Sequence, residues 1–239
     1  MVSARIIAVD GPAGSGKSTV GQQLAQRLGY LYFDTGVMYR AMTLACLQFG
    51  IAVEDQEAVE ALAQRVAIDV RAPTIADGRQ YDVLLDAQDA TWALRSPEVE
   101  GSVSRVSMYA GVRRAMSAKQ REIGLRGSVV MVGRDIGTVV LPEADLKIYL
   151  NASVEERARR RWREAEARGE AVGSCEDVLG AMRERDRIDS TREVAPLKAA
   201  SDAVVVDSTS MSVEQVVDRV WRLSKGEAGA ARQRGRGKR

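Results

Sequence analysis

Histidine is absent from all 239 residues of the sequence. Its absence excludes Ser-His-Asp and Cys-His catalysis, a histidine-ligated zinc site and an imidazole general base. Only two cysteines are present, Cys46 and Cys175, and they form neither a CxxC pair nor a metal-binding spacing. We therefore expect both to be reduced thiols. Any chemistry must use Lys, Arg, Asp, Ser or Thr side chains, backbone amides and a hard cation.

Long apolar runs are also missing. The longest, such as residues 203–206, are far too short to cross a bilayer. The chain reaches Asp10 and a glycine-rich turn within the length of one strand, which does not fit a secretory signal peptide. Hydrophobic residues make up 45% and charged residues 28%, which is typical of soluble proteins. We expect a cytoplasmic protein without membrane association, built as one core domain with or without inserts.

The net charge of +2 hides an uneven distribution of charge along the chain. Residues 225–239 contain six Lys or Arg and one Glu, whereas the other 224 residues contain 29 basic and 32 acidic side chains. This terminal segment is rich in Gly, Ala and Arg and has little apolar surface to bury, so we expect a disordered basic tail. It either solubilises the protein or contacts RNA or acidic partners, and we expect no requirement for nucleic acid.

The periodicity of the apolar residues predicts an α/β core. Five short β-rich runs alternate with amphipathic helical stretches, which predicts a five-stranded parallel sheet with helices on both faces, a three-layer fold. The predicted strands are residues 5–9, 30–33, 128–132, 146–150 and 203–206.

Residues 66–99 have a different pattern. Two β-rich runs flank Pro73 and the turn pair Asp77-Gly78, which predicts a small antiparallel unit inserted into the core. Helical patterns follow at residues 97–110 and 112–123. Capping boxes, in which a serine precedes an acidic or amide side chain by three residues, predict further helix starts. They begin at Ser153, Ser174 and Ser212.

A glycine-rich motif, G-x-x-x-x-G-K-S, lies between the first predicted strand and the first predicted helix. Its glycines allow several backbone N–H groups to point inward, and the helix N-terminus adds partial positive charge. Lys17 brings a full charge to the β- and γ-phosphates of a nucleotide, and the Ser18 hydroxyl can bind Mg²⁺. We predict an NTP site with Mg²⁺ as cofactor. Its residues are Gly11, Pro12, Ala13, Gly14, Ser15, Gly16, Lys17, Ser18 and Thr19.

NTP binding alone would allow a GTPase, a motor or a small-molecule kinase. A guanine-specific NKxD motif cannot be present, because the one asparagine, Asn151, is followed by Ala152. Residues 157–192 contain ten arginines and eight acidic residues, a balance that does not fit a nucleic-acid surface. A mobile cover closing over phosphates would have this composition. We expect two to four of these arginines to contact ligand and the others to form a solvated helix face.

Three further motifs follow in order. They are Asp34-Thr-Gly-Val-Met-Tyr-Arg40, Gly133-Arg-Asp-Ile-Gly-Thr138 and Glu184-Arg-Asp-Arg-Ile-Asp-Ser-Thr-Arg192, the last leading into Ala195-Pro-Leu197. With the glycine-rich motif, they resemble the bacterial cytidylate kinase family of P-loop nucleoside monophosphate kinases, from about residue 6 to residue 223. The resemblance implies transfer of the ATP γ-phosphoryl group to CMP, and usually to dCMP, with Mg²⁺.

The resemblance also implies a domain organisation. It places a P-loop NTPase fold in residues 1–224, with a nucleoside-monophosphate-binding insert at about residues 62–100 and a short helical lid at about residues 157–192. Nothing in the sequence demands an oligomer, so we expect a monomer.

Site residues are implied by the same resemblance. Acceptor binding is assigned to Thr35, Arg40, Ser104, Arg113, Arg134, Asp135, Arg185, Asp189 and Arg192, and catalysis to Lys17, Arg134, Arg185 and Arg192. Arg40 and Arg134, expected at the carboxyl ends of strands, can fork onto the CMP phosphate. Arg185 is expected to meet the ribose together with Asp189. Arg192, with Arg157 or Arg161, is expected to stabilise charge on the transferring group.

The base would be read by three side chains. Asp135 can accept from the cytosine amino group, while Arg113 and Ser104 donate to the ring acceptors. Uracil reverses the pattern at two positions, and each buried unpaired group costs roughly 1–3 kcal/mol. Two such groups would separate CMP from UMP by a factor on the order of hundreds.

Alternatives remain open at this point. Asp135 can instead pair only with an arginine or hold the water shell of Mg²⁺, and Ser104 can be a neutral surface serine. The chain can also be another small P-loop kinase, acting on a different nucleotide or on a metabolite such as shikimate. An RNA-associated ATPase that uses the basic tail would show RNA-stimulated ATP hydrolysis.

Overall fold

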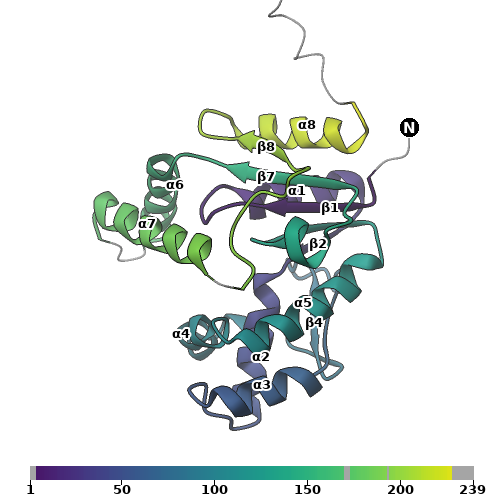
Figure 1. Ribbon diagram of the computed structural model, residues 1–239, viewed down its shortest axis with the longest axis vertical. Helices are drawn as coiled ribbons and strands as arrows, with labels where there is room; N and C mark the ends of the chain where they lie inside the picture. The colour runs from purple at the N-terminus through teal and green to yellow at the C-terminus, as the bar shows by residue number, and fades with distance from the viewer. Residues whose placement is uncertain (1–3, 170–172, 193, 228–239) are drawn as a thin grey trace, which may run out of the picture.

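The structure is a computed structural model that describes residues 4–169, 173–192 and 194–227. Its centre is a parallel sheet of five strands in the order β2-β6-β1-β7-β8 (Figure 1). The predicted five-stranded parallel sheet is thereby confirmed. The strands are β1 (Ile6–Asp10), β2 (Leu31–Asp34), β6 (Val129–Val132), β7 (Leu146–Asn151) and β8 (Val204–Asp207).

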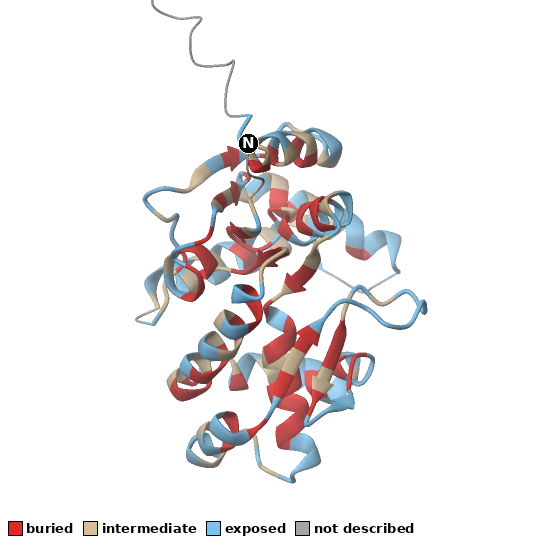
Figure 2. Ribbon diagram, turned by 90° about the vertical axis from the view of Figure 1, so that its right-hand side faces the viewer, coloured by how far each residue is buried: buried red, intermediate tan, exposed pale blue. Residues whose placement is uncertain are grey.

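Helices cover both faces of this sheet. Those that flank it are α1 (Lys17–Leu28), α2 (Gly36–Gln48), α5 (Ala110–Leu125) and α8 (Val213–Ser224). Successive side chains of a strand point to opposite faces, and β6 shows this clearly. Val130 and Val132 pack with α1 and α8, whereas Val129 and Met131 pack with α2 and α5. The sheet is therefore buried on both sides (Figure 2), and the three-layer prediction is confirmed.

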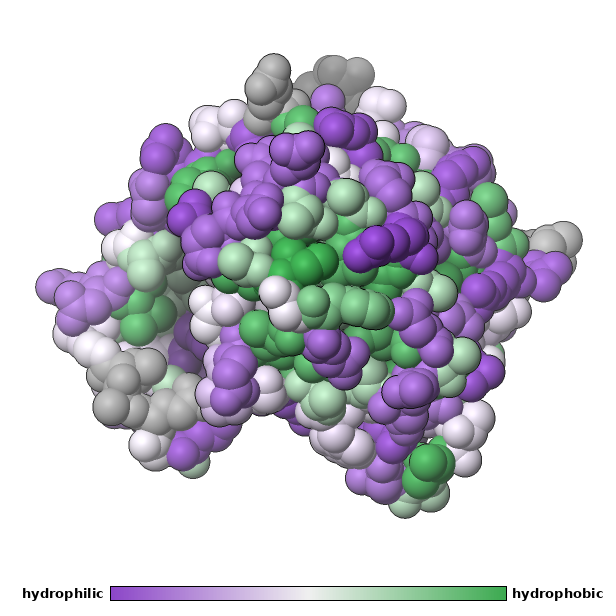
Figure 3. Space-filling model, turned by 90° about the horizontal axis from the view of Figure 1, so that it is seen from below, coloured by the Kyte–Doolittle hydropathy of each residue, from purple (hydrophilic) through white to green (hydrophobic). Residues whose placement is uncertain are grey.

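The predicted antiparallel unit is present as a three-stranded sheet in the order β3-β4-β5. Helix α3, which was not predicted, precedes it, and two helical segments follow it below the main sheet (Figure 1). Its apolar side chains Val70 and Val83 belong to the same continuous core as Phe33 of β2, so this unit has no separate core. The elements are α3 (Gln56–Arg65), β3 (Ile68–Arg71), β4 (Asp82–Leu85), β5 (Gln88–Asp89), η1 (Ala93–Arg95) and α4 (Pro97–Val106). When the molecule is seen from below the view of Figure 1, apolar side chains gather near the centre of the surface and hydrophilic side chains surround them (Figure 3).

Helices α6 (Val154–Ala167) and α7 (Cys175–Thr191) lie against each other and project from one end of the sheet (Figure 1). The capping boxes predicted at Ser174 and Ser212 are both confirmed. The box predicted at Ser153 is half wrong. Its hydroxyl accepts from the backbone of Glu156, but the Glu156 carboxylate pairs with two arginines one turn further along the helix. Charged guanidinium donors outcompete a neutral N–H for a carboxylate.

Three further expectations concern the chain outside the site. Cys46 and Cys175 are both free, as predicted. Within the described ranges, none of the helices combines the length and the apolar character needed to cross a membrane. The predicted disordered tail falls mainly on residues 228–239, which lie outside the described residues.

Candidate active site

A cleft of about 1460 Å³ opens at the carboxyl ends of the main-sheet strands, where ligands bind in such folds. Its walls come from the loop of residues 11–19, from α4 and α5, from the α6–α7 pair and from the segment before α8. All nine predicted acceptor residues line the cleft, and so do residues 13–19. Gly11 and Pro12 belong to the same loop but are not among the residues that line the cleft.

Glycine is required at the start of this phosphate-binding loop (residues 11–19). Gly11 has a φ of 148°, and a Cβ added there would collide with the Leu150 carbonyl oxygen. Gly14 and Gly16 also have positive φ values of 73° and 88°, which L side chains rarely adopt. The loop therefore curls tightly into the N-terminus of α1, whose free N–H groups suit an anion.

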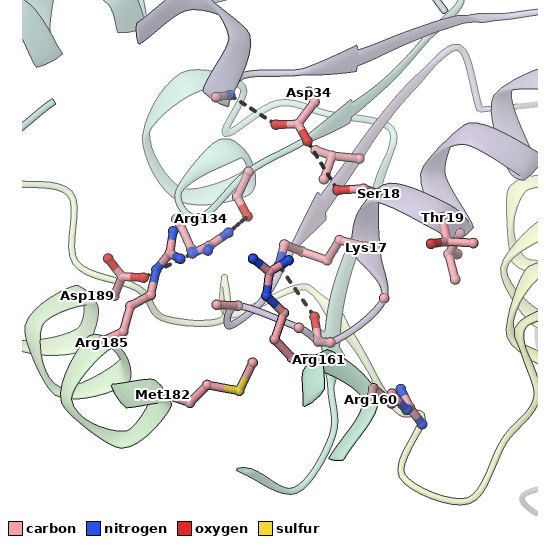
Figure 4. Close-up of a pocket in the computed structure, with 18 of the residues that line it drawn as sticks. Lys17, Ser18, Thr19, Asp34, Arg134, Arg160, Arg161, Met182, Arg185 and Asp189 are labelled. Carbon is pink, nitrogen blue, oxygen red and sulfur yellow. Dashed lines mark hydrogen bonds and ion pairs between the residues drawn. The ribbon is translucent and has the colours of Figure 1, made fainter. Parts of the chain in front are cut away.

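Lys17 is buried at the first position of α1. Its Nζ donates to the Pro12 carbonyl oxygen at 2.6 Å and lies 3.4 Å from the Ser15 hydroxyl. Burial lowers the pKa of Lys17 well below its ordinary value, and the charge of Arg134 lowers the pKa further. An ammonium group held in this way is stabilised when a phosphate enters. In Figure 4, Lys17, Arg134 and Arg161 converge on the same space from different elements.

Ser18 makes a contact that sequence reasoning missed. Its hydroxyl donates to a carboxylate oxygen of Asp34 at 3.1 Å, at the carboxyl end of β2 (Figure 4). The two side chains offer hard oxygen donors beside the phosphate-binding loop, which is the donor type that Mg²⁺ prefers. Among the described residues no group of three or more His, Cys, Asp or Glu could hold a metal. Mg²⁺ commonly binds through few protein ligands together with phosphates, so this donor pair fits it.

Opposite the loop stands a network of arginines and aspartates. Arg134 Nε donates to Asp189 at 3.1 Å, and Arg192 lies 3.5 Å from the other oxygen of that carboxylate. Arg113 and Arg192 each approach Asp135 to 3.8 Å from different sides. Burial raises the pKa of Asp135, while the neighbouring charges of Arg113 and Arg192 oppose this rise. The predicted residues of α5, α7 and the loop after β6 are thus brought together.

Two buried polar atoms in this network have no hydrogen-bond partner among the described residues. They are Arg113 Nε and Arg192 Nη2. Buried polar groups are nearly always satisfied, so orphaned donors of this kind need an explanation. Both belong to side chains that line the cleft and flank the Asp135 carboxylate. These two side chains therefore keep donor capacity that the described residues do not use, beside the Asp135 carboxylate.

Three predicted acceptor residues take other positions on the wall. Thr35 is buried, and its hydroxyl donates to the Val132 carbonyl oxygen at 3.0 Å, which ties α2 to β6. Arg40 lies within α2 and pairs with Glu100, so its expected position at the end of a strand is wrong. Ser104 is an exposed residue of α4 at the edge of the cleft.

The arginines of α6 and α7 divide into three groups. Arg157 does not line the cleft: its buried guanidinium donates to the carbonyl oxygens of Ala13 (2.9 Å) and Ala152 (3.0 Å), so its expected contact with the transferring group is not supported. Arg161 and Arg185 line the cleft and have no hydrogen bond or ion pair within the described part of the chain. Others form the solvated helix face that was expected. Such exposed pairs are Arg183–Glu155 and Arg187–Glu184.

Two more contacts near the cleft were not foreseen. Arg160 reaches the Ser208 carbonyl oxygen at 2.7 Å and so joins α6 to the segment before α8. Asp10, at the end of β1, accepts the backbone N–H groups of Ile136 (2.8 Å) and Gly137 (2.7 Å). These amides open η2 (Ile136–Val140), directly after Asp135. Burial raises the pKa of Asp10 to about 6, although both backbone hydrogen bonds oppose the rise.

The protein has a three-layer fold with a phosphate-binding loop, and this loop faces an arginine-lined wall and the arginine-rich helices α6 and α7. These features together define a P-loop kinase. The comparison with protein families agrees and is more specific: the cytidylate kinase family model matches residues 7–226. The chain belongs to the cytidylate kinase family.

Individual relatives match over most of their length. A cytidylate kinase of Chloroflexus aggregans is 52% identical, over 88% of this chain and 90% of that protein. A cytidylate kinase of Herpetosiphon aurantiacus is 47% identical, over 96% of this chain and 98% of that protein. A solved shikimate kinase of Acinetobacter baumannii has a TM-score of 0.47 and 18% identity, over 94% of this chain and 95% of that one. That likeness is too distant to assign a substrate.

Proposed function

We propose that this protein transfers the γ-phosphoryl group of ATP to CMP and to dCMP, giving ADP and CDP or dCDP. Membership of the cytidylate kinase family supports this function. The observation that carries it in the structure is the wall around Asp135, where Arg113 and Arg192 flank the carboxylate in a cleft that also contains a phosphate-binding loop. The cleft exceeds the usual volume of a single-ligand pocket, about 300–1,000 Å³, as a site for two nucleotides must.

On the donor side, residues 13–19 would hold the triphosphate of ATP, with Lys17 at the β- and γ-phosphates. Ser18 and Asp34 would hold Mg²⁺, which supplies charge neutralisation on the phosphates when bound. The Ser18–Asp34 hydrogen bond supports this assignment because it places two hard oxygen atoms beside Lys17.

On the acceptor side, Thr35, Arg40, Arg134 and Arg185 would hold the phosphate and ribose of the acceptor. Asp135 would accept a hydrogen bond from the cytosine amino group, and Arg113 would donate to a ring acceptor. Ser104 and Asp189 would complete the acceptor site. The position of Asp135 between Arg113 and Arg192 supports its role, since both cations favour the ionised, hydrogen-bond-accepting carboxylate against the effect of burial on its pKa.

The reaction needs little from the protein besides positioning and charge. The acceptor phosphate is already ionised at neutral pH, and one of its oxygens forms the new bond to the γ-phosphorus of ATP. The bond from the γ-phosphorus to the oxygen that bridges the β- and γ-phosphates breaks. ADP leaves with the electron pair. Lys17, Arg134, Arg185 and Arg192 would stabilise the charge on the transferring group. No general base is required, which agrees with a chain that has no histidine.

Two segments would move during this reaction. We assign the nucleoside-monophosphate-binding insert to about residues 62–100 and the lid to about residues 157–192, with the core completed within residues 1–224. Closure of the lid would exclude water, which otherwise competes as the acceptor. The projecting α6–α7 pair, whose Arg161 and Arg185 face the cleft without partners among the described residues, supports the lid assignment.

A panel of acceptors tests this function. ADP release is measured with ATP, Mg²⁺ and, separately, CMP, dCMP, UMP, AMP, GMP or shikimate. We expect kcat/KM to be highest for CMP and dCMP and to exceed that for UMP by a factor on the order of hundreds. Removal of Mg²⁺ with a chelator should stop turnover, and added Mg²⁺ should restore it. Equal or faster turnover with another acceptor would overturn the proposal.

A further inference from the structure

Arg40 already holds an anion in this structure. Its guanidinium contacts both carboxylate oxygens of Glu100: Nη1 pairs with Oε2, and Nη2 lies 3.3 Å from Oε1. This two-pronged geometry is the one in which a guanidinium binds a phosphate. Both residues line the cleft, Arg40 from α2 and Glu100 from the first turns of α4. The carboxylate thus takes the place at Arg40 that the acceptor phosphate would need.

The electrostatic setting of Glu100 agrees with such a role. The hydrogen bond from Arg40 lowers the pKa of Glu100, and the charge of Arg161 on α6 lowers it further. Glu100 is therefore a carboxylate at neutral pH and lies in the field of two cations that face the cleft. Its side chain is 62% exposed and that of Arg40 33%, so the pair is accessible to an incoming anion.

We propose that Glu100 is an affinity-determining residue that competes with the acceptor phosphate for Arg40. This inference rests on the proposed function, because it takes a nucleoside monophosphate as the ligand. To bind, the acceptor must displace Glu100 from the Arg40 guanidinium. The acceptor therefore binds more weakly than it would to a free Arg40, and Glu100 can return to Arg40 as the product leaves.

If Glu100 only stabilised α4, removing its charge should have the same effect as removing a neighbouring charge from the same turn. A negative charge in the first turn of a helix is favourable because it faces the positive end of the helix dipole. Glu98 and Glu100 both lie in the first turn of α4, but Glu98 is not among the cleft-lining residues. Glu98→Gln is therefore the matched control: it removes the same charge from the same turn without changing Arg40.

The experiment compares wild-type enzyme, Glu100→Gln and Glu98→Gln. We measure the KM values for CMP and ATP and the Kd for CMP by calorimetry. Exposed ion pairs are weak, so Glu100→Gln should lower the KM and Kd for CMP by about two- to fivefold. The KM for ATP should not change, and Glu98→Gln should match wild type. An unchanged or higher Kd for CMP in Glu100→Gln would overturn the proposal.

A double-mutant cycle shows whether the gain passes through Arg40. Arg40→Ala should weaken CMP binding, and Glu100→Gln should then add no gain in the Arg40→Ala background. A gain that persists without Arg40 would also overturn the proposal. Glu100→Ser provides a second variant if Glu100→Gln folds poorly, and its CMP affinity should rise as well.

The two proposals fail in distinguishable ways. If wild-type enzyme neither binds nor phosphorylates CMP, the proposed function fails and the role of Glu100 fails with it. If wild-type enzyme phosphorylates CMP and removal of the Glu100 charge gives no tighter binding, only the competition at Arg40 is refuted.

Discussion

Arg157 of α6 contacts both Asp186 of α7 and the phosphate-binding loop. Arg157 Nη1 lies 3.2 Å from one oxygen of the Asp186 carboxylate, and Nη2 contacts the other. The same guanidinium donates to the carbonyl oxygen of Ala13 in the loop at 2.9 Å. Asp186 follows Arg185 on α7, so this link holds the turn of α7 that carries Arg185. Arg157 thus acts as a positioning residue between two parts of the site.

Asp186→Asn removes the charge that holds α7 to Arg157. Small displacements of catalytic groups are costly, so we expect kcat to fall by about ten- to a hundredfold while the KM for ATP changes little. The matched control is Glu184→Gln on the same helix, whose carboxylate pairs with the exposed Arg187. The control should keep normal kinetics. Equal effects of the two substitutions on kcat would contradict a positioning role.

Lys17→Ala removes the ammonium group from the phosphate-binding loop. We expect kcat to fall by at least about 10²–10³-fold, because Lys17 would neutralise charge on the transferring group. The fold should remain, since burial already disfavours the charged lysine, as its lowered pKa shows. Thermal unfolding and far-UV circular dichroism check the fold, and ADP release checks turnover. Near-normal turnover in a folded variant would refute the role of Lys17.

Much of the fold could be predicted because it is encoded locally. Short β-rich runs between amphipathic helical stretches identified all five strands of the main sheet. The glycine-rich motif identified the loop at the end of β1. Helix α3 was missed although its signal was present. Asp55 caps it, and Val59, Leu62 and Ala63 are buried at helical spacing. The inserted unit was predicted, but not that its apolar side chains would merge with the main core, because that depends on contacts between distant segments.

The parts of the site that escaped prediction depend on tertiary contacts. Arg157 and Arg161 lie one helical turn apart in the same arginine-rich run. Contacts with Asp186 on α7 and with the carbonyl oxygens of Ala13 and Ala152 make Arg157 structural, while Arg161 faces the cleft. The pairing of Arg40 with Glu100 links two helices sixty residues apart. No local pattern of residues specifies such pairs.

The buried carboxylate of Asp10 should make stability depend on pH. Its pKa is raised from 3.8 to about 6 in the folded protein, so the folded state holds a proton that the unfolded chain releases between these values. The contribution of Asp10 to the free energy of unfolding is therefore greatest below about pH 4 and is lost as the pH rises through about 6. Between about pH 4 and 7, this loss amounts to at most about 3 kcal/mol.

Chemical denaturation of wild type and Asp10→Asn across this pH range measures the effect. As the pH rises, the unfolding free energy of wild type should fall relative to that of Asp10→Asn. Asp145→Asn is the control for lost acceptor bonds, since this exposed aspartate also accepts two backbone N–H groups. A wild-type minus Asp10→Asn difference that stays constant from about pH 4 to 7 would contradict the raised pKa.

The most direct test of the account is the ratio of kcat/KM for CMP to kcat/KM for UMP, measured for wild type and for Asp135→Ala. If the Asp135 carboxylate reads the cytosine amino group, its loss removes about 1–3 kcal/mol of discrimination, so the ratio should fall by about five- to a hundredfold. The KM for ATP should stay close to that of wild type. A ratio that remains at the wild-type value in a folded, active Asp135→Ala enzyme would show that the wall around Asp135 does not read the base.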